Sequence, residues 1–303
     1  MDRMKRSYLR LLAKDDFREK KRQEFQAWIG KIFELGFLAD YDSIRLTQGD
    51  GGLDGIILSE LAAVAVYAPR EMTASELQRK IAADFSKAMK TFADRGVVIK
   101  KFILIHNDEG LTKDVGTLVL KLNQDHLSVA IEIWRFERLW MLLEKLTEDQ
   151  LDELLGAAPT TANMERLEMP AIRDVVQYLT TIQLTPPPLS DIEIPNAKKL
   201  EYNRLGEYIQ HILRAGRVKQ KLVQQYLEGA TDMTTGEKIA EGFRQKYVAC
   251  RDSGMEPDDI FETLWELAGG NHFTTPTQHA AVTAVLSHFF HFCDIFENAP
   301  PPI

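Results

Sequence analysis

Apolar residues follow two different spacings along the first part of the chain. In residues 17–35 they recur mostly at three- and four-residue steps, which predicts an amphipathic helix that stops at Gly36. The chain then changes to short alternating or continuous apolar runs, a pattern typical of strands. Three strands are expected at residues 41–46, 53–58 and 63–67, with a glycine-rich turn at 48–52.

The alternation of helical and strand patterns continues to residue 155. Thr73 or Ser75 can cap a helix that runs to Gly96. The elements expected after it are a strand at 97–105, a helix at 112–122, a strand at 127–134 and a helix at 136–155. The order is therefore helix, three strands, helix, strand, helix, strand. It predicts an α/β domain with a mixed central sheet flanked by helices, the order expected of a restriction-endonuclease-like core.

The remainder of the chain is helical in pattern. Small polar residues at 157–162 and the Pro186-Pro187-Pro188 run mark two breaks, with one helix at 171–182 between them. Further helices are predicted at 200–215, 218–227, 235–251, 257–268 and 275–296. The predicted organisation is an α/β domain over residues 1–160, a linker with a bridging helix over 161–195 and an all-α domain over 196–303.

Composition agrees with two folded domains. The chain has 303 residues, of which 45% are hydrophobic, which is enough for two separate cores. Its longest apolar runs are far shorter than the roughly 20 residues of a membrane-spanning helix, so no membrane association is expected. The start of the chain lacks the apolar segment of a signal peptide, and only Cys250 and Cys293 are cysteines. A cytoplasmic location fits both observations.

Charge is distributed unevenly. The net charge of -8 argues against a general nucleic-acid coat protein, because affinity for phosphates comes mainly from clustered Lys and Arg. Basic residues nevertheless crowd the first helices, where Lys20, Lys21 and Arg22 are candidates for tracking a phosphate backbone. A solvated helix surface is the alternative interpretation of the same residues.

Candidate chemistry centres on the run Gly49-Asp50-Gly51-Gly52-Leu53-Asp54-Gly55. Its glycines leave the backbone around Asp54 open to a close ligand at the entrance of a strand. Hydrolysis of a phosphodiester needs a divalent cation, and Mg²⁺ (or Mn²⁺) takes oxygen ligands. Asp54 would supply one carboxylate, a carbonyl near Ala65 or Val66 a second oxygen, and Glu24 a third. This placement is similar to that of the first metal ligand in PD-(D/E)xK nucleases.

The neighbouring strand departs from the usual composition of such a site. Ala65 and Tyr67 stand where Glu or Gln and then Lys are usual. Lys80, on the next predicted helix, can reach the same cleft and replace the missing lysine, whereas Lys87 and Lys90 are weaker candidates.

Several of these residues also have a plain structural interpretation. Asp50 can hold the turn through its own backbone, Glu24 can be a surface residue near Lys20, and Lys80 can belong to the polar face of its helix. Histidines and a cysteine near the C-terminus suggest a zinc site, but their spacing fits no closed tetrahedral site, and core packing is favoured. These residues are His272, His279, His288, His291 and Cys293. The chain has no GxxxxGK[ST] loop, so any use of ATP must come from a partner.

Together with Val66-Tyr67-Ala68-Pro69 and residues 80–85, the glycine-rich run resembles the nuclease subunit of ABC-three-component bacterial defence systems, of which Lamassu is the best-known type. The N-terminal domain is similar to the double-stranded DNA endonuclease domain of CBASS effectors. Residues 199–205 and 288–296 resemble parts of the helical domain by which such subunits join an SMC-like ATPase.

The resemblance implies a metal-dependent phosphodiesterase that cleaves double-stranded DNA and acts against phages or plasmids. It implies two partners, an SMC-like ABC ATPase and a small accessory subunit, which hold the nuclease inactive until it is released or forms a homo-oligomer. Asp54 would be a metal ligand and Lys80 the displaced lysine. Relatives carry Gln where this chain has Ala65, so the copy is degenerate, or was altered to silence cleavage, or uses a backbone carbonyl. The alternatives are a catalytically inactive DNA-binding or scaffolding subunit and an RNA nuclease.

Overall fold

The computed structural model contains two compact units. The described residues are 1–44, 53–71, 73–107, 110, 112–182, 199–292 and 295–297. One unit comprises residues 13–155, and the other combines residues 1–12 with residues 156–303. Helix α1 (Arg3–Glu19) contributes residues to both. The structure thus divides the chain near residue 155, and it groups the first twelve residues and residues 161–182, the described part of the expected linker, with the C-terminal helices.

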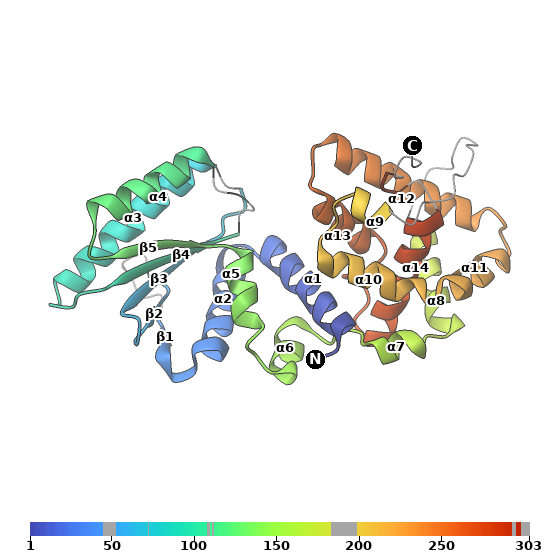
Figure 1. Ribbon diagram of the computed structural model, residues 1–303, viewed down its shortest axis with the longest axis horizontal. Coiled ribbons are helices and arrows are strands. Elements are labelled where there is room, and N and C mark those ends of the chain that lie inside the picture. Colours follow the sequence, from blue (N-terminus) through green and yellow to red (C-terminus); the bar gives the residue numbers. More distant parts are fainter. Residues whose placement is uncertain are drawn as a thin grey trace. The chain divides into compact units, whose positions relative to one another are not determined.

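A five-stranded mixed sheet forms the centre of the first unit. Its strands are β1 (Tyr41–Ser43), β2 (Gly55–Ile57), β3 (Ala62–Tyr67), β4 (Lys101–His106) and β5 (Ala130–Trp134). They lie side by side in chain order (Figure 1). The first three strands pair antiparallel, and β4 and β5 continue the sheet parallel to β3. The predicted mixed central sheet is therefore confirmed.

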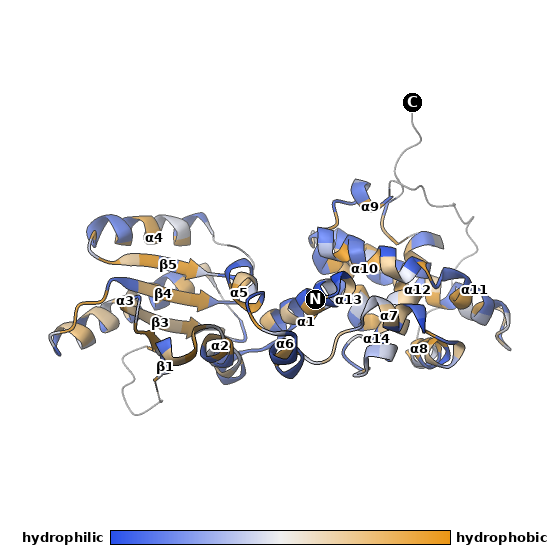
Figure 2. Cartoon of the chain, turned by 60° about the horizontal axis from the view of Figure 1, so that its bottom comes forward, coloured by the Kyte–Doolittle hydropathy of each residue, from blue (hydrophilic) through white to orange (hydrophobic). Residues whose placement is uncertain are grey.

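Helices cover both faces of this sheet. They are α2 (Arg22–Phe37), α3 (Ala74–Ala93), α4 (Lys113–Asp125) and α5 (Phe136–Leu143), and α6 (Glu148–Leu155) packs against α2. Helices α3 and α4 pack on the face that carries Ala63 and Ala65, where their apolar residues form one core cluster with Phe102 and Leu104. On the other face, Phe33 of α2 contacts the rings of the β1 and β5 aromatics. Strands β3, β4 and β5 are accordingly strongly hydrophobic (Figure 2).

Three predicted helices are each interrupted. The helix expected at 200–215 is divided between α9 (Lys199–Tyr202) and α10 (Glu207–Arg217), and Arg204 between them has a left-handed backbone with φ of 55°. The helix expected at 17–35 is divided between α1 and α2, because the Arg22 N–H donates to the carbonyl of Ala68, at 2.6 Å, and not to a helical carbonyl. The helix expected at 136–155 is divided between α5 and α6. There the Thr147 hydroxyl accepts from the Gln150 N–H and the Gln150 side chain accepts from the Thr147 N–H, which is a capping box that begins a new helix.

The second unit consists of helices around one central helix. Its helices are α7 (Thr161–Glu165), α8 (Met169–Thr181), α9 (Lys199–Tyr202), α10 (Glu207–Arg217), α11 (Gln220–Glu228), α12 (Thr235–Asp252), α13 (Pro257–Leu267) and α14 (Pro276–Phe292). Helices α7, α8, α10, α11 and α13 all pack against α14. This central position explains the nearly continuous apolar sequence of α14, since a helix surrounded by others needs no polar face. Within the described part of the chain, no helix has the length and apolar character needed to cross a membrane.

The histidines of α14 belong to this core. His288 is 6% exposed, and His279 bonds through Nε2 to the Phe273 carbonyl. Among the described residues, no group of three or more His, Cys, Asp or Glu side chains is arranged to hold a metal ion. Cys293, the other residue considered for zinc, lies outside the described residues.

Buried histidines make the helical unit sensitive to acid. Burial lowers the pKa of His288 to about 4 and that of His291 to about 4, and for His291 the charges of Arg217 and Lys199 add to the effect. The unfolded chain then binds protons below pH 6.5 that the folded chain does not bind, so stability falls as the pH drops from 6.5 to 4. We expect the buried His288 alone to contribute a loss of roughly 2 kcal/mol at pH 5.

Thermal unfolding at pH 7 and pH 5 will test this expectation. His288→Gln should reduce the difference in melting temperature between pH 7 and pH 5. His272→Gln, which changes an exposed histidine of the same unit, should leave that difference unchanged. An equal pH dependence in the wild type and both variants would contradict the assignment.

Candidate functional site

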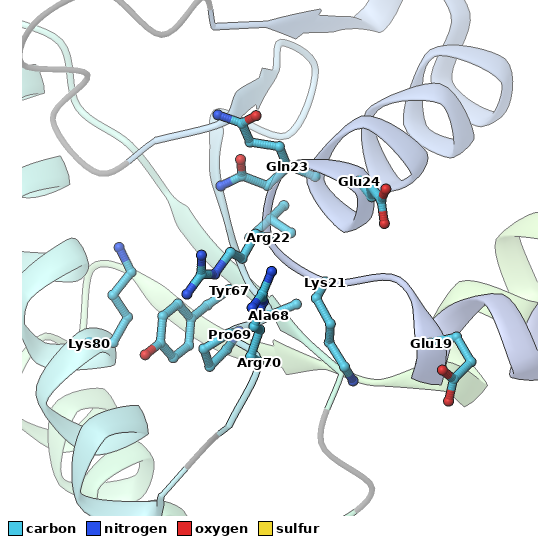
Figure 3. A pocket seen from close by; sticks show the side chains of 12 residues that line it. Glu19, Lys21, Arg22, Gln23, Glu24, Tyr67, Ala68, Pro69, Arg70 and Lys80 are labelled. Atoms are coloured by element: carbon cyan, nitrogen blue, oxygen red, sulfur yellow. The ribbon is translucent and has the colours of Figure 1, made fainter.

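A pocket of about 810 Å³ opens at the carboxyl end of β3. Its walls come from the beginning of α2, from the segment that leaves β3 and from α3 (Figure 3). The lining residues are Glu19, Lys21, Arg22, Gln23, Glu24, Gln26, Val66, Tyr67, Ala68, Pro69, Arg70 and Lys80. All of them belong to the α/β unit.

Long-range hydrogen bonds hold the basic segment before α2 at this end of the sheet. The Arg22 N–H donates to the Ala68 carbonyl just after β3, and the Asn107 side-chain amide donates to the Lys20 carbonyl at 3.1 Å just after β4. Arg22 adopts a left-handed backbone with φ of 53°, which is unfavourable for a side chain with a Cβ. The segment that carries the three predicted DNA-binding residues is thus fastened to the ends of two parallel strands.

Positive charge dominates the pocket. Lys21, Arg22, Arg70 and Lys80 line it, against two acidic residues, Glu19 and Glu24. In Figure 3 the carboxylates of Glu19 and Glu24 point away from Tyr67 and Lys80. Such a cationic hollow on a chain of net charge -8 is suited to an anionic ligand.

The three predicted DNA-binding residues differ in their surroundings. Lys20 pairs with Asp16 at 2.6 Å and does not line the pocket. Lys21 and Arg22 both line it, and the Lys21 ammonium also donates to the Arg18 carbonyl. Glu24, the predicted third oxygen ligand, is an exposed residue in the first turn of α2.

Asp54 is held by its backbone and its carboxylate. Its N–H donates to the Val64 carbonyl at 2.8 Å, and its carbonyl accepts from the Ile44 N–H at 2.9 Å. Asp54 Oδ2 accepts from the Val66 N–H at 2.6 Å. The carboxylate therefore lies against β3 at a residue that lines the pocket. The glycine-rich turn and Asp50 lie outside the described residues, which resume at Leu53.

Tyr41 is a neighbour of Asp54 that the sequence did not reveal. Burial, followed by the negative charges of Asp54 and Glu34, raises the pKa of the Tyr41 hydroxyl to about 12. The tyrosine ring covers Gly55, where an added Cβ atom would overlap the ring and its hydroxyl oxygen. Gly55 is thus needed for close packing of β1 on β2 beside Asp54, in addition to any role in admitting a ligand.

Position 65 is part of the hydrophobic core. Ala65 is 1% exposed and packs in the cluster that contains Leu53, Ile81 and Phe85. Its side chain fills space and supplies no ligand atom.

Lys80 is the α3 lysine that the structure brings to the pocket. Its ammonium lies 2.9 Å from Asp84 Oδ2 and 5.5 Å from the centre of the Tyr67 ring. Lys87 and Lys90 are exposed and do not line the pocket. Asp84 was not identified as a functional residue from the sequence. The available signal was an acidic residue on the apolar face of α3, four residues after Lys80.

The described residues offer a magnesium ion fewer carboxylates than a complete protein cage would. They contain no group of three or more acidic, histidine or cysteine side chains fit for a metal. Magnesium, however, is commonly held by one or two carboxylates with water and phosphate oxygens. Asp54, half-buried and fixed beside the pocket, fits the role of one such ligand.

The comparison with protein families concerns the helical unit. Residues 171–297 match the family described as C-terminal domain 10 of the ABC-three component (ABC-3C) systems. The match supports membership in an anti-phage system of this kind. ABC-3C systems are multi-component complexes. No curated protein and no solved structure matches the chain significantly.

The contact between Tyr41 and Gly55 gives a test of the packing beside the site. Gly55→Ala should destabilise the chain by about 1 to 3 kcal/mol, because the added methyl group overlaps the tyrosine ring. Gly30→Ala in α2 is the matched control, since nothing lies within 4 Å of its added Cβ. The control should be neutral or stabilising by up to about 1 kcal/mol. Denaturant unfolding measures both, and equal effects would show that Tyr41 does not cover Gly55.

Proposed function

We propose that this protein is the metal-dependent DNA endonuclease subunit of an ABC-3C defence system. The proposal rests on one observation, that the Asp54 carboxylate is bonded to Val66 of β3 beside a cationic pocket that also contains Lys80. The sheet topology supports a restriction-endonuclease-like interpretation, because three antiparallel strands are followed by a helix and a parallel strand. The family match supports the assignment to a defence complex.

Asp54 would be the first ligand of the cation. Bound Mg²⁺ would stabilise the negative charge that develops on the phosphate and lower the pKa of a bound water. The hydrogen bond with Val66 orients the carboxylate that would hold the cation. Glu24 is an exposed residue on the wall of the same pocket and would act through a water molecule.

Lys80 would replace the lysine that the strand lacks. Its ammonium lies over the ring of Tyr67, the residue at the usual lysine position, so a positive charge is present there although the strand contributes none. Such a charge would orient the attacking water and offset charge on the phosphate. Lys21, Arg22 and Arg70 would bind neighbouring phosphates of the duplex.

The helical unit would connect the nuclease to its partners. We propose that it joins an SMC-like ABC ATPase and a small accessory subunit, which hold the nuclease inactive until foreign DNA is sensed. Release or homo-oligomerisation would then activate it, since cutting both strands of a duplex requires two active sites.

A catalytically inactive DNA-binding or scaffolding subunit is the second candidate. The observation that favours it is Ala65, which is buried in an apolar cluster and provides no ligand atom. This subunit would keep the cationic pocket and lose cleavage.

Cleavage of plasmid DNA distinguishes the two candidates. Wild-type protein and Ala65→Gln are incubated with supercoiled plasmid in Mg²⁺, in Mn²⁺ and in EDTA, with structured RNA in parallel. We expect metal-dependent nicking or linearisation of DNA by at least one of the two proteins. Because the Ala65→Gln change places a polar side chain in an apolar cluster, the melting temperature of the variant is measured as well. DNA binding without cleavage by both folded proteins would favour the scaffold, and degradation of RNA alone would indicate an RNA nuclease.

Asp54→Asn should abolish that cleavage. The amide oxygen can still accept from the Val66 N–H, so the fold should be preserved while the negative charge is lost. We expect the rate to fall by at least about 100-fold, since metal binding contributes several kcal/mol and about 1.4 kcal/mol is a factor of ten in rate. Asp42→Asn, an exposed carboxylate on β1, is the control and should retain activity. Equal rates for wild type and Asp54→Asn would refute the metal-ligand role.

Arg22→Gly isolates the contribution of the pocket to DNA binding. Glycine accepts the left-handed backbone at this position, so the guanidinium is removed without added strain. Affinity for a short duplex should fall, and the slope of log affinity against log salt should decrease by about one. Arg204→Gly is the matched control, because Arg204 has φ of 55°, is exposed and lies in the helical unit. An equal loss in both variants would show that the pocket itself contributes nothing.

A further inference from the structure

Asp84 is a buried carboxylate among apolar residues. Its side chain is only 2% exposed. The other buried residues of α3 are Leu77, Ile81, Phe85 and Ala88, which pack in the core cluster on the sheet. Asp84 thus occupies a position where the helix otherwise presents hydrophobic side chains.

Such a position is costly for a carboxylate. Transfer of a charged group out of water carries a penalty that its ion pair repays only in part, and replacing a buried pair by apolar residues is often neutral or stabilising. The partner, Lys80, is 34% exposed and stands 2.9 Å away. The pair therefore has one buried member and one member at the pocket, an arrangement that stability alone does not favour.

The pair determines where the lysine ammonium lies. A lysine side chain is long and flexible, so it has no defined position unless contacts hold it. Among the described residues, two contacts hold Lys80, the Asp84 carboxylate and the ring of Tyr67 at 5.5 Å from its centroid. Together they hold the charge against the strand end that lines the pocket, whereas Lys87 and Lys90 of the same helix are exposed elsewhere.

We propose that Asp84 is a positioning residue that holds the Lys80 ammonium at the pocket in place of a lysine on β3. The inference rests on the proposed function, because it assigns Asp84 a role in the same cleavage reaction. Asp84 contacts neither substrate nor cation in this proposal and acts only through Lys80.

The experiment combines two measurements on full-length protein. The first is the cleavage rate at saturating DNA together with KM, for Asp84→Asn, Asp84→Glu, Lys80→Met and the Asp84→Asn/Lys80→Met double variant. These variants are made in the protein that cleaves DNA, either the wild type or Ala65→Gln. The second is the rate at which an amine-reactive reagent modifies Lys80, read by mass spectrometry, with Lys87 and Lys90 as internal references. It requires no nuclease activity.

A positioning role predicts a specific pattern. Asp84→Asn should lower kcat by about 100-fold with little change in KM, since a displacement of about 1 Å can have an effect of that size. Asp84→Glu should recover part of that loss. In the Lys80→Met background the second substitution should have no additional effect, because Asp84 acts only through the lysine. Modification of Lys80 should become several-fold faster in Asp84→Asn while that of Lys87 and Lys90 stays constant.

The outcomes separate this inference from the proposed function. If no background cleaves DNA, the nuclease assignment fails, and the modification rate still decides whether Asp84 holds Lys80. An unchanged modification rate in Asp84→Asn would overturn the positioning role. If Asp84→Asn slows cleavage by the same factor with Lys80 present and in the Lys80→Met background, the positioning role is overturned too, because the effect would be a general structural one. If Asp84→Asn does not fold, Asp84→Glu is the second test, because it retains the charge but moves the carboxylate. The inference expects this variant to be partly impaired, so an unaltered kcat and an unaltered modification rate would count against it.

Discussion

The hydrogen bond from the Val66 N–H to the Asp54 carboxylate is the contact on which the candidate site depends. Asp54 lies just before β2. Its N–H is bonded to Val64 of β3, and its carbonyl is bonded to Ile44, which follows β1. The additional bond to its carboxylate fixes the orientation of that group relative to the sheet. Since Val66 of β3 lines the pocket together with the segment that follows the strand, this bond fixes the carboxylate beside one wall of the pocket.

Charge at this pocket comes from helices and loops, because the strand supplies little. Position 65 is committed to the apolar core, and position 67 carries an aromatic ring. The ring is useful in a different way, as it provides a surface over which the Lys80 ammonium lies. The basic residues before α2 reach the pocket because their backbone is bonded to the ends of β3 and β4. A cationic site can thus form on a chain whose total charge is negative.

The two units provide different kinds of evidence. The helical unit contains the whole segment that matches a family of ABC-3C C-terminal domains, so its assignment rests on sequence similarity. Its core, built around α14, contains histidines whose pKa values are lowered by burial. The α/β unit lies outside that match, and its proposed chemistry rests on the positions of a few side chains.

Local patterns in the sequence determined the type of most elements, the mixed sheet and the presence of Asp54 at a strand entrance, because periodicity and turn residues act over a few neighbouring positions. The tertiary structure alone decided where the first long helix is interrupted, since the acceptor of the Arg22 N–H, Ala68, comes from a distant strand end. It also decided that Lys80 points into a pocket and that Asp84 beside it is buried. Burial and hydrogen-bond partners depend on residues far apart in the chain, which no local spacing encodes.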